Sequence, residues 1–427
     1  GINHARGCFI LDIWRIKGGR RLDGACFVQG SKNATLPIIA ASLVVPAGSE
    51  LLNVPQLRDV DAALRIVRHL GCTAEQRGGD VYIDSTQLSY CAIPHDLMEE
   101  MRSSVIFMGA LLARCGEARL SLPGGCQLGK RPIDLHLAAL RSLGAEIEEN
   151  GREIYCHAEE LRGAEIVLPF PSVGATENTV LAACAAKGET VIHGAAREPE
   201  IIALQEYLNL LVADISGAGT GDIYIRGMEP ETQVCFRIMP DRIVASTLAC
   251  AVAACGGDVE LRGVDPAHFS TVLYFLNQSG CDIISNKRSV RLISDGRLKA
   301  VEEISTAPYP GFPTDAQPVL MSALLKAAGR TLITENIFEN RFRQAAELRR
   351  LGADITVSGR RAEIWGVDRL RGTMLNATDL RGGAAMIIAG LCAEGETVVC
   401  DDGHVTRGYE RFDRKLRSLG ADVNLEY

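Results

Sequence analysis

The sequence predicts an α/β protein with two pseudo-symmetric domains, each built from three repeated units of about 70 residues. A leucine-glycine ending followed by a short strand-like segment recurs along the 427 residues, for example LGAEIE (143–148) and LGADIT (351–356). Its glycine occupies positions 71, 144, 280, 352 and 420, and Val212 takes that place in a sixth copy. The spacings of 73, 68, 68, 72 and 68 residues predict one repeated structural unit.

A second feature recurs with the same period. A glycine followed by alternating apolar residues predicts a short strand in each unit, at 48–54, 116–122, 188–194, 256–263, 329–335 and 395–401. Each of these segments follows an Ala-rich helix that is apolar on nearly all sides, so these helices are expected to lie inside their domains. Each unit therefore reads as a buried helix, a strand, a second helix and two further strands.

Three units suit one domain of ordinary size. The expected first domain is 32–237, and the second is 1–31 together with 238–427, because the division falls in TQVCFRIMP (232–240). A strand around 9–17 precedes the first unit, so we expect it to pair with the C-terminal domain. GAGTGD (217–222) lies between two strand patterns and predicts a hairpin turn rather than a dinucleotide site.

Composition narrows the function classes. The net charge of −8 argues against a nucleic-acid surface or an anionic membrane as the main partner. No apolar run reaches the roughly 18 residues of a spanning helix, and the first residues show no secretion signal. The 14 cysteines lack any CxxC spacing, which indicates reduced thiols in a cytosolic protein rather than a zinc site.

Charged residues gather just before or at the start of the buried helices. Asp, Ser, Thr and Asn are explained there as helix caps. Lys32, Arg102, Arg242 and Arg381 are not, because a cation at the positive end of a helix is electrostatically unfavourable. At any one of these positions, an ordinary helix cap next to a surface cation whose side chain extends into solvent is a sufficient explanation. The whole set favours a receptor for a polyanionic small molecule.

The segment PGGCQLGKRP (123–132) resembles a P-loop in its glycine and lysine spacing. Arg131 stands where a P-loop has the hydroxyl that binds magnesium, and Pro132 lacks a backbone N–H. Lys130 and Arg131 would favour the thiolate form of Cys126. The segment is therefore not a P-loop, and a loop built for Cys126 is the alternative.

Nine segments together resemble the enolpyruvyl transferase family, and within it the branch that acts on UDP-N-acetylglucosamine. They are GSKNATLPIIAA (30–41), PGGCQLGKRPIDLH (123–136), SVGATEN (172–178), AAREPEI (195–201), PDRI (240–243), YPGFPTD (309–315), IFENRF (337–342), ATDLR (377–381) and RGYE (407–410). The resemblance covers about residues 20–427. It implies two inside-out α/β barrel domains around a cleft.

The resemblance also implies a reaction. The enolpyruvyl group of phosphoenolpyruvate is joined to the 3-hydroxyl of UDP-N-acetylglucosamine by addition and then elimination, and phosphate leaves. This is the first committed step of peptidoglycan synthesis. No cofactor, metal, nucleic acid or membrane insertion is implied, and the two substrates are the expected partners.

Site residues follow from the same resemblance. Four cations match the phosphoenolpyruvate side of the cleft: Lys32, Arg102, Arg131 and Arg407. Three residues match contacts to the amino sugar, with Asp315 as general base: Asn33, Thr314 and Asp315. The uridine and diphosphate contacts match Arg131, Pro132, Ile133, Asp134, Leu135, Ser172, Val173 and Gly174. Further matches to the nucleotide sugar and the cleft lining are Ile337, Phe338, Arg341, Asp379, Arg381, His136, Glu198, Asn340 and His404.

Residues 123–132 match the family's lid, in which Cys126 protonates the methylene carbon or assists the departure of phosphate. Some positions depart from the family pattern: Val244 replaces a usual Glu, Phe170 replaces a frequent Lys, and Gly382 and Gly383 stand where helix formers are commoner. Two alternatives stay open, namely transfer to shikimate phosphate and a catalytically silent protein that binds a UDP-sugar.

Overall fold

The computed structural model describes residues 11–101, 103–121 and 133–427. The chain divides into two compact units. Unit 1 contains the described residues up to Val28, together with 242–307 and 311–427, and unit 2 contains 29–241 and 308–310. The sequence predicted divisions at 31/32 and 237/238, which lie three and four residues from those between 28 and 29 and between 241 and 242.

Unit 2 contains three four-stranded sheets in the described part of the chain. The first has the order β14 (Gln233–Arg237), β3 (Gly48–Leu52), β5 (Asp80–Asp84), β4 (Thr73–Arg77). The second has the order β6 (Ala92–Ile93), β7 (Glu117–Ser121), β9 (Glu153–His157), β8 (Glu146–Asn150). The third has the order β10 (Glu165–Val167), β11 (Glu189–His193), β13 (Asp222–Gly227), β12 (Ala213–Ser216).

The described strands of unit 1 repeat this pattern. One sheet has the order β2 (Leu22–Phe27), β15 (Gly257–Arg262), β17 (Ser289–Ser294), β16 (Asp282–Asn286). The next has the order β18 (Glu303–Ser305), β19 (Arg330–Thr334), β21 (Arg361–Trp365), β20 (Asp354–Ser358). The last has the order β22 (Met374–Asn376), β23 (Glu396–Asp401), β1 (Asp12–Lys17), β24 (Asp422–Glu426).

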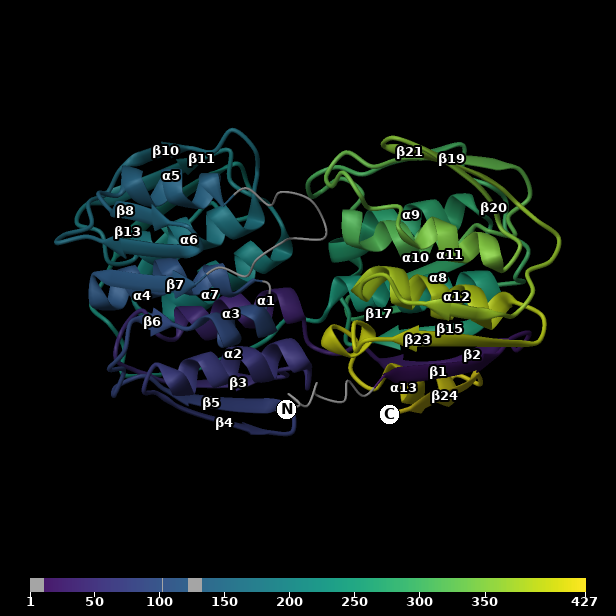
Figure 1. Cartoon of the computed structure of the whole chain (residues 1–427), viewed down its shortest axis with the longest axis horizontal. Helices are drawn as coiled ribbons and strands as arrows, with labels where there is room; N and C mark the ends of the chain where they lie inside the picture. Colours follow the sequence, from purple (N-terminus) through teal and green to yellow (C-terminus); the bar gives the residue numbers. More distant parts are fainter. Residues whose placement is uncertain (1–10, 102, 122–132) are drawn as a thin grey trace, which may run out of the picture. The chain divides into compact units, whose positions relative to one another are not determined.

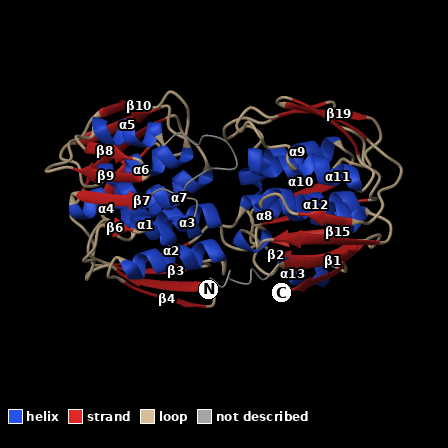
Figure 2. Cartoon of the chain, viewed as in Figure 1, coloured by secondary structure: helices blue, strands red, loops and turns tan. Residues whose placement is uncertain are grey.

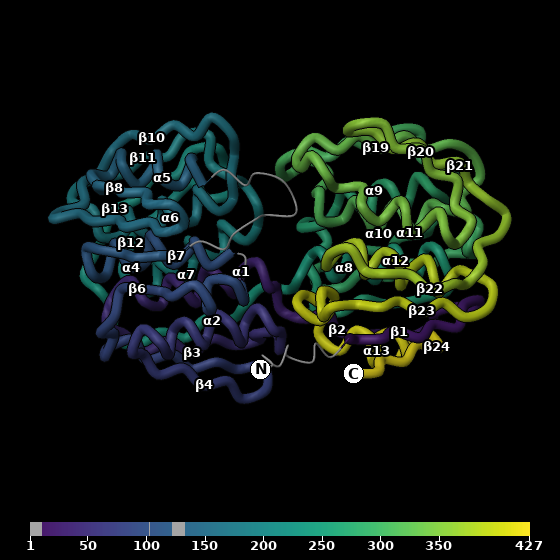
Figure 3. The backbone as a smooth tube through the Cα atoms, in the orientation of Figure 1, coloured from purple at the N-terminus to yellow at the C-terminus, as the bar shows by residue number. Residues whose placement is uncertain are grey.

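Each sheet of the described residues has one parallel pair of strands and two antiparallel pairs. One strand of the parallel pair comes from outside the repeat of about 70 residues that supplies the other. The expected pairing of the N-terminal strand is confirmed, because β1 pairs with both β23 and β24. Figure 1 shows β1 in purple beside the yellow strands β23 and β24, and Figure 3 shows the same path as a tube. The expected hairpin at 217–222 is also confirmed, since it joins β12 to β13.

The helices fall into two classes. The internal helices are buried on almost all sides: α1 (Lys32–Ala41), α4 (Phe107–Cys115), α6 (Val173–Ala183), α8 (Arg242–Cys255), α10 (Gln317–Ala323) and α12 (Leu380–Cys392). In unit 1, α10 packs against both α8 and α12. Figure 2 shows these helices in blue with the red strands around them, which is the inside-out arrangement.

The second helix of each repeat of about 70 residues is amphipathic. Its apolar side packs against the core, and its polar side faces solvent. These helices are α2 (Arg58–His69), α5 (Asp134–Ser142), α7 (Pro199–Leu211), α9 (Ser270–Gln278), α11 (Gln344–Arg350) and α13 (Phe412–Ser418). A short helix, α3 (His95–Glu100), and the 3₁₀ turns Ser104–Ile106, Pro266–Phe269, Thr314–Ala316 and Val405–Arg407 complete the described elements.

None of the helices in the described ranges combines the length and apolar character needed to cross a membrane. The twelve cysteines among the described residues are free thiols. Cys250 is fully buried, and Cys255 Sγ lies 3.7 Å from Cys392 Sγ, within hydrogen-bonding distance.

Because β1 closes the last sheet by lying between β23 and β24, its tryptophan should contribute more to stability than the other tryptophan of the chain. Trp14 of β1 is 0% exposed and meets the Phe412 ring edge-on at 6.3 Å, whereas Trp365 of β21 is 48% exposed. Trp14→Ala should lower the free energy of unfolding by about 3–5 kcal/mol because it leaves a large cavity. Trp365→Ala, the matched control, should cost less than about 1 kcal/mol. Urea unfolding followed by circular dichroism measures both, and equal losses would contradict the closing role of β1.

Candidate active site

Lys32 begins the internal helix α1 in unit 2. Ser31 caps this helix, because its hydroxyl oxygen accepts from Ala34 N at 3.1 Å. The Lys32 ammonium donates to Asp59 Oδ2 at 3.0 Å, and the Lys32 backbone N–H donates to Asp241 Oδ2 at 3.2 Å. The two carboxylates offset the unfavourable placement of a cation at the positive end of a helix. Asn33 follows as the second helical residue and is half-buried.

The start of α6 is organised by a buried network. Ser172 caps the helix by accepting from Ala175 N at 3.2 Å. Asn178 Oδ1 accepts from Gly109 N at 2.8 Å, so its amide nitrogen faces His136 Nδ1 at 2.8 Å. His136 Nδ1 is therefore the acceptor and Nε2 carries the proton.

His136 lies directly against the residues predicted to hold the diphosphate. A Cβ placed on Gly174 would lie 2.8 Å from His136 Cε1 and 3.1 Å from Nε2, so only glycine permits this approach. Burial lowers the pKa of His136 to about 4, which keeps the ring neutral at pH 7. A neutral N–H donor therefore lies beside the first turn of α6. Ile133, Asp134 and Leu135 are the three residues immediately before His136, at the N-cap and first turn of α5.

Asp315 of unit 1 is held between two buried arginines. Its Oδ1 accepts from Arg341 at 2.8 Å, and its Oδ2 lies 3.6 Å from the Arg381 guanidinium. The arginine side chains are 7% and 4% exposed, whereas the Asp315 side chain is 31% exposed. The carboxylate thus reaches solvent while the two cations behind it restrain its orientation.

Asp379 precedes Arg381 and caps α12. Its Oδ1 accepts from Arg381 N at 3.0 Å and Gly382 N at 2.9 Å. The adjacent Gly383 is explained by close packing, because a Cβ there would lie 2.6 Å from Val405 Cγ2. Gly383 therefore allows the turn that carries Arg407 to approach the helix, whereas a Cβ on Gly382 would meet Thr378 and Asp379.

The turn that carries Arg407 is held by Asp401, a residue that was not predicted from the sequence. Asp401, at the end of β23, is 0% exposed and accepts from His404 N at 2.8 Å and Val405 N at 3.0 Å. Both oxygens of this buried carboxylate are thus satisfied by the backbone of the turn. Thr406 adds a hydrogen bond from its hydroxyl to Asp12 Oδ2 of β1 at 3.3 Å.

Glu335 is a second missed residue, and three predicted residues depend on it. It lies at the end of β19, is 1% exposed, and accepts from Thr314 Oγ1 at 3.1 Å. It also accepts from Ile337 N at 2.9 Å and Phe338 N at 3.2 Å. The only sequence signal was an acidic residue ending an apolar strand, which is typical of a solvent-facing position.

The structure corrects one expectation about charge. The charge pattern predicted that a bound anion compensates the cations at the helix starts. For Lys32 and Arg381 the chain itself supplies a carboxylate, from Asp59 and Asp315 respectively. Because neither carboxylate lies near its cation in the sequence, the pairing could not be predicted from local patterns.

The roles of all the predicted site residues stay predictions. Arg102, Cys126, Arg131 and Pro132 lie outside the described residues. Glu198 is the residue before α7 and is half-buried, while Asn340 and His404 lie in the turns before Arg341 and Arg407.

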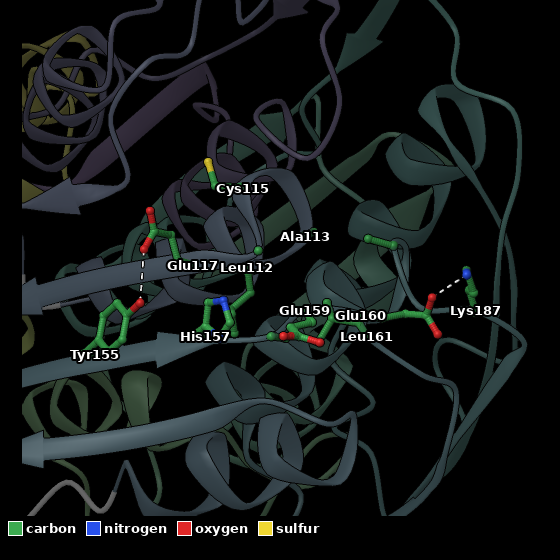
Figure 4. A pocket seen from close by; sticks show the side chains of 13 residues that line it. Leu112, Ala113, Cys115, Glu117, Tyr155, His157, Glu159, Glu160, Leu161 and Lys187 are labelled. Carbon is green, nitrogen blue, oxygen red and sulfur yellow. Dashed lines mark hydrogen bonds and ion pairs between the residues drawn. The ribbon is translucent and has the colours of Figure 1, made fainter.

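A surface groove of about 710 Å³ lies elsewhere on unit 2, and Figure 4 shows it. Its walls are Leu112, Ala113, Cys115, Gly116, Glu117, Tyr155, His157, Ala158, Glu159, Glu160, Leu161, Ala185 and Lys187. None of the predicted site residues belongs to it. Glu117 accepts from the Tyr155 hydroxyl at 3.2 Å, and Glu160 is paired with Lys187. Three carboxylates against one lysine disfavour an anionic ligand there.

Comparison with known proteins gives a consistent result. The family model for EPSP synthase (3-phosphoshikimate 1-carboxyvinyltransferase) matches residues 16–416. UDP-N-acetylglucosamine 1-carboxyvinyltransferase 2 of Caldanaerobacter subterraneus is 47% identical over 96% of this chain and 98% of its own length. The UDP-N-acetylglucosamine 1-carboxyvinyltransferase of Trichlorobacter lovleyi is 44% identical over 97% of this chain and 99% of its own.

Solved structures support the same fold. The enolpyruvyl transferase NikO from Streptomyces tendae superposes with a TM-score of 0.87 at 26% identity, covering 97% of this chain and 99% of its own. EPSP synthase from Acinetobacter baumannii superposes with a TM-score of 0.76 at 19% identity, covering 98% of this chain and all of its own. The second likeness concerns the fold alone.

His136 predicts a pH dependence of stability. Between the ordinary histidine pKa of 6.5 and the folded value of about 4, the unfolded chain binds a proton that the folded chain does not. Stability should therefore fall as the pH drops through this window, by at most roughly 3 kcal/mol. Urea unfolding at pH 7 and pH 4.5 should show a smaller difference for His136→Gln than for the wild type. Identical differences would exclude His136 as the responsible group.

Proposed function

The chain belongs to the EPSP synthase family of carboxyvinyltransferases, and within this enzyme family we propose that it acts on UDP-N-acetylglucosamine. In this proposal the enolpyruvyl group of phosphoenolpyruvate passes to the 3-hydroxyl of the sugar and phosphate is released. The observation that carries the proposal is the 44–47% identity, over nearly the whole chain, to relatives named for this reaction. The reaction is the first committed step of peptidoglycan synthesis, which links the enzyme to cell shape and division.

The charge of the candidate residues suits these substrates. Phosphoenolpyruvate carries a phosphate and a carboxylate, and we assign its binding to the four cations Lys32, Arg102, Arg131 and Arg407. Lysine and arginine are the side chains that bind such oxyanions best. The diphosphate of the nucleotide sugar suits the N-terminal end of α6 at Ser172–Gly174, where the backbone N–H groups and the helix dipole favour negative charge.

We assign proton abstraction from the sugar to Asp315. In the addition step, the 3-hydroxyl oxygen bonds to C2 of phosphoenolpyruvate, its proton passes to Asp315, and the methylene carbon gains a proton to become a methyl group. In the elimination step, the methyl group loses a proton and the C2–O bond to phosphate breaks. The exposed carboxylate restrained by Arg341 and Arg381 supports the role of Asp315. Cys126 is assigned to the methylene proton or to phosphate departure.

The test of the proposal is phosphate release from phosphoenolpyruvate with two acceptors offered separately. Release with UDP-N-acetylglucosamine and none with 3-phosphoshikimate is the expected result. The opposite preference would favour the sister reaction. No release with either acceptor, together with tight binding of the UDP-sugar in calorimetry, would favour a silent UDP-sugar-binding protein.

Removing the proposed base should separate binding from turnover. Asp315→Asn keeps an acceptor oxygen for Arg341 but removes the basic carboxylate. The turnover number should fall by about 10²–10⁴, the usual contribution of a positioned general base. The dissociation constant for the UDP-sugar, measured by calorimetry, should change by less than about threefold. Turnover within a few-fold of the wild type would mean that another group takes the proton.

Cys126 should be the reactive thiol. The phosphonate epoxide fosfomycin mimics the charge of phosphoenolpyruvate, so the cations at its site should deliver it to this sulfur. Intact-mass and peptide mass spectrometry should show one adduct per chain, on Cys126, formed faster with the UDP-sugar present. Cys126→Asp, which can still carry a proton, should keep activity and lose sensitivity. Labelling spread over several of the 14 cysteines would contradict the assignment.

A further inference from the structure

Glu335 links three segments that are separate in the sequence. Its Oε1 accepts from Thr306 Oγ1 at 2.9 Å, at the end of β18, and from two backbone N–H groups of the loop that follows β19. Its Oε2 accepts from Thr314 Oγ1, in the 3₁₀ turn that also carries Asp315. One carboxylate thus joins the end of a strand, the Asp315 turn and the 337–338 loop.

Arg341 closes this set of contacts into a ring. The loop held at Ile337 and Phe338 continues to Arg341, whose guanidinium lies over the Phe338 ring at 5.7 Å and donates to Asp315. Thr306 tightens the same region, because its hydroxyl oxygen accepts from Asn336 N at 2.8 Å. The position of Asp315 therefore depends on its ion pairs with Arg341 and Arg381 and, through the neighbouring Thr314, on the hydrogen bond to Glu335.

The chemistry of Glu335 explains why this support is rigid. A carboxylate that is 1% exposed is costly unless donors surround it. Four donors reach Glu335, two hydroxyls and two backbone N–H groups, at 2.9–3.2 Å. Hydrogen bonds to a buried charge are stronger than neutral ones, and each donor would lose its acceptor if the carboxylate were removed.

We propose that Glu335 is a positioning residue for the nucleotide-sugar side of the reaction. This proposal rests on the proposed function, in which the Thr314–Asp315 turn and the Ile337–Phe338 loop contact the nucleotide sugar. Glu335 itself does not touch substrate. It sets the distance between the base and the loop that packs on the nucleotide sugar, and a displacement of about 1 Å can cost on the order of 10²-fold in rate.

The test uses three variants at two positions. Glu335→Ala removes all four acceptor contacts, and Glu335→Gln keeps the shape and one acceptor oxygen. Glu363→Ala is the matched control, because Glu363 lies on β21 of the same sheet and also accepts from two side chains, Arg330 and Trp365, but on an exposed surface. Steady-state kinetics are measured with each substrate varied in turn, together with the thermal midpoint.

Glu335→Ala should lower kcat/KM for UDP-N-acetylglucosamine by about 100-fold while the KM for phosphoenolpyruvate changes less than about threefold. Glu335→Gln should recover most of this loss and remain about three- to tenfold below the wild type, because its amide oxygen still accepts from the loop N–H groups. Glu363→Ala should match the wild type. A rise in the KM for phosphoenolpyruvate as large as that for UDP-N-acetylglucosamine, or wild-type kinetics for Glu335→Gln and Glu335→Ala alike, would overturn the proposal.

Hydrogen exchange gives a readout that does not require activity. The peptide containing Ile337 and Phe338 should exchange faster in Glu335→Ala, and a peptide from the internal helix α12 should not. If the wild type transfers no enolpyruvyl group, the proposed function fails, and unchanged exchange in this peptide would separately refute the structural role of Glu335. If Glu335→Ala does not fold, the substrate-specific loss and the exchange of Glu335→Gln decide the question.

Discussion

The burial of the internal helices is the constraint on which the rest of the structure depends. In α12 every residue from Arg381 to Leu391 is buried, and α8 is buried from Arg242 to Ala253. Such helices cannot carry polar chemistry along their sides, so functional groups are confined to their ends. Lys32, Ser172 and Arg381 all lie at or next to the start of an internal helix, where the positive end of the helix dipole favours negative charge.

Charge at a buried helix end is costly unless it is paired, and the protein meets this cost with carboxylates from other elements. Asp59 pairs with Lys32, and Asp315 pairs with Arg341 and Arg381. Glu335 and Asp401 are the converse case, buried carboxylates satisfied by hydroxyl and backbone donors of the turns they support. Together these contacts convert short turns, which would otherwise be loose, into defined platforms for the candidate residues.

The repeated architecture follows from the same burial. A single repeat of about 70 residues, with two helices and a few strands, cannot bury all sides of its apolar helix. The repeats must therefore assemble around a shared core. Strands contributed by other parts of the chain complete the sheets. β14 pairs with β3 in unit 2, and β1 inserts between β23 and β24 in unit 1. The N-terminal strand consequently brings Asp12 to the Thr406 hydroxyl, 394 residues away.

The sequence by itself determined the features that depend on local pattern. Alternating apolar residues predicted the strands, all-round apolar segments predicted the internal helices, and Ser31, Ser172 and Asp379 could be recognised as caps because a cap bonds to residues two or three positions away. The nine ordered segments placed the chain in its family, and that resemblance selected Asp315, Lys32 and Arg407 as candidates.

Only the tertiary structure decided which charges meet. Asp59 reaches Lys32 across 27 residues, and Glu335 collects donors from 306, 314 and 337–338. In the sequence these carboxylates resemble ordinary surface residues of a helix and a strand. The approach of Val405 to Gly383 is equally invisible, since it depends on how a turn packs against α12. The physical reason is that such contacts depend on packing and register between distant elements, and local pattern carries no information about either.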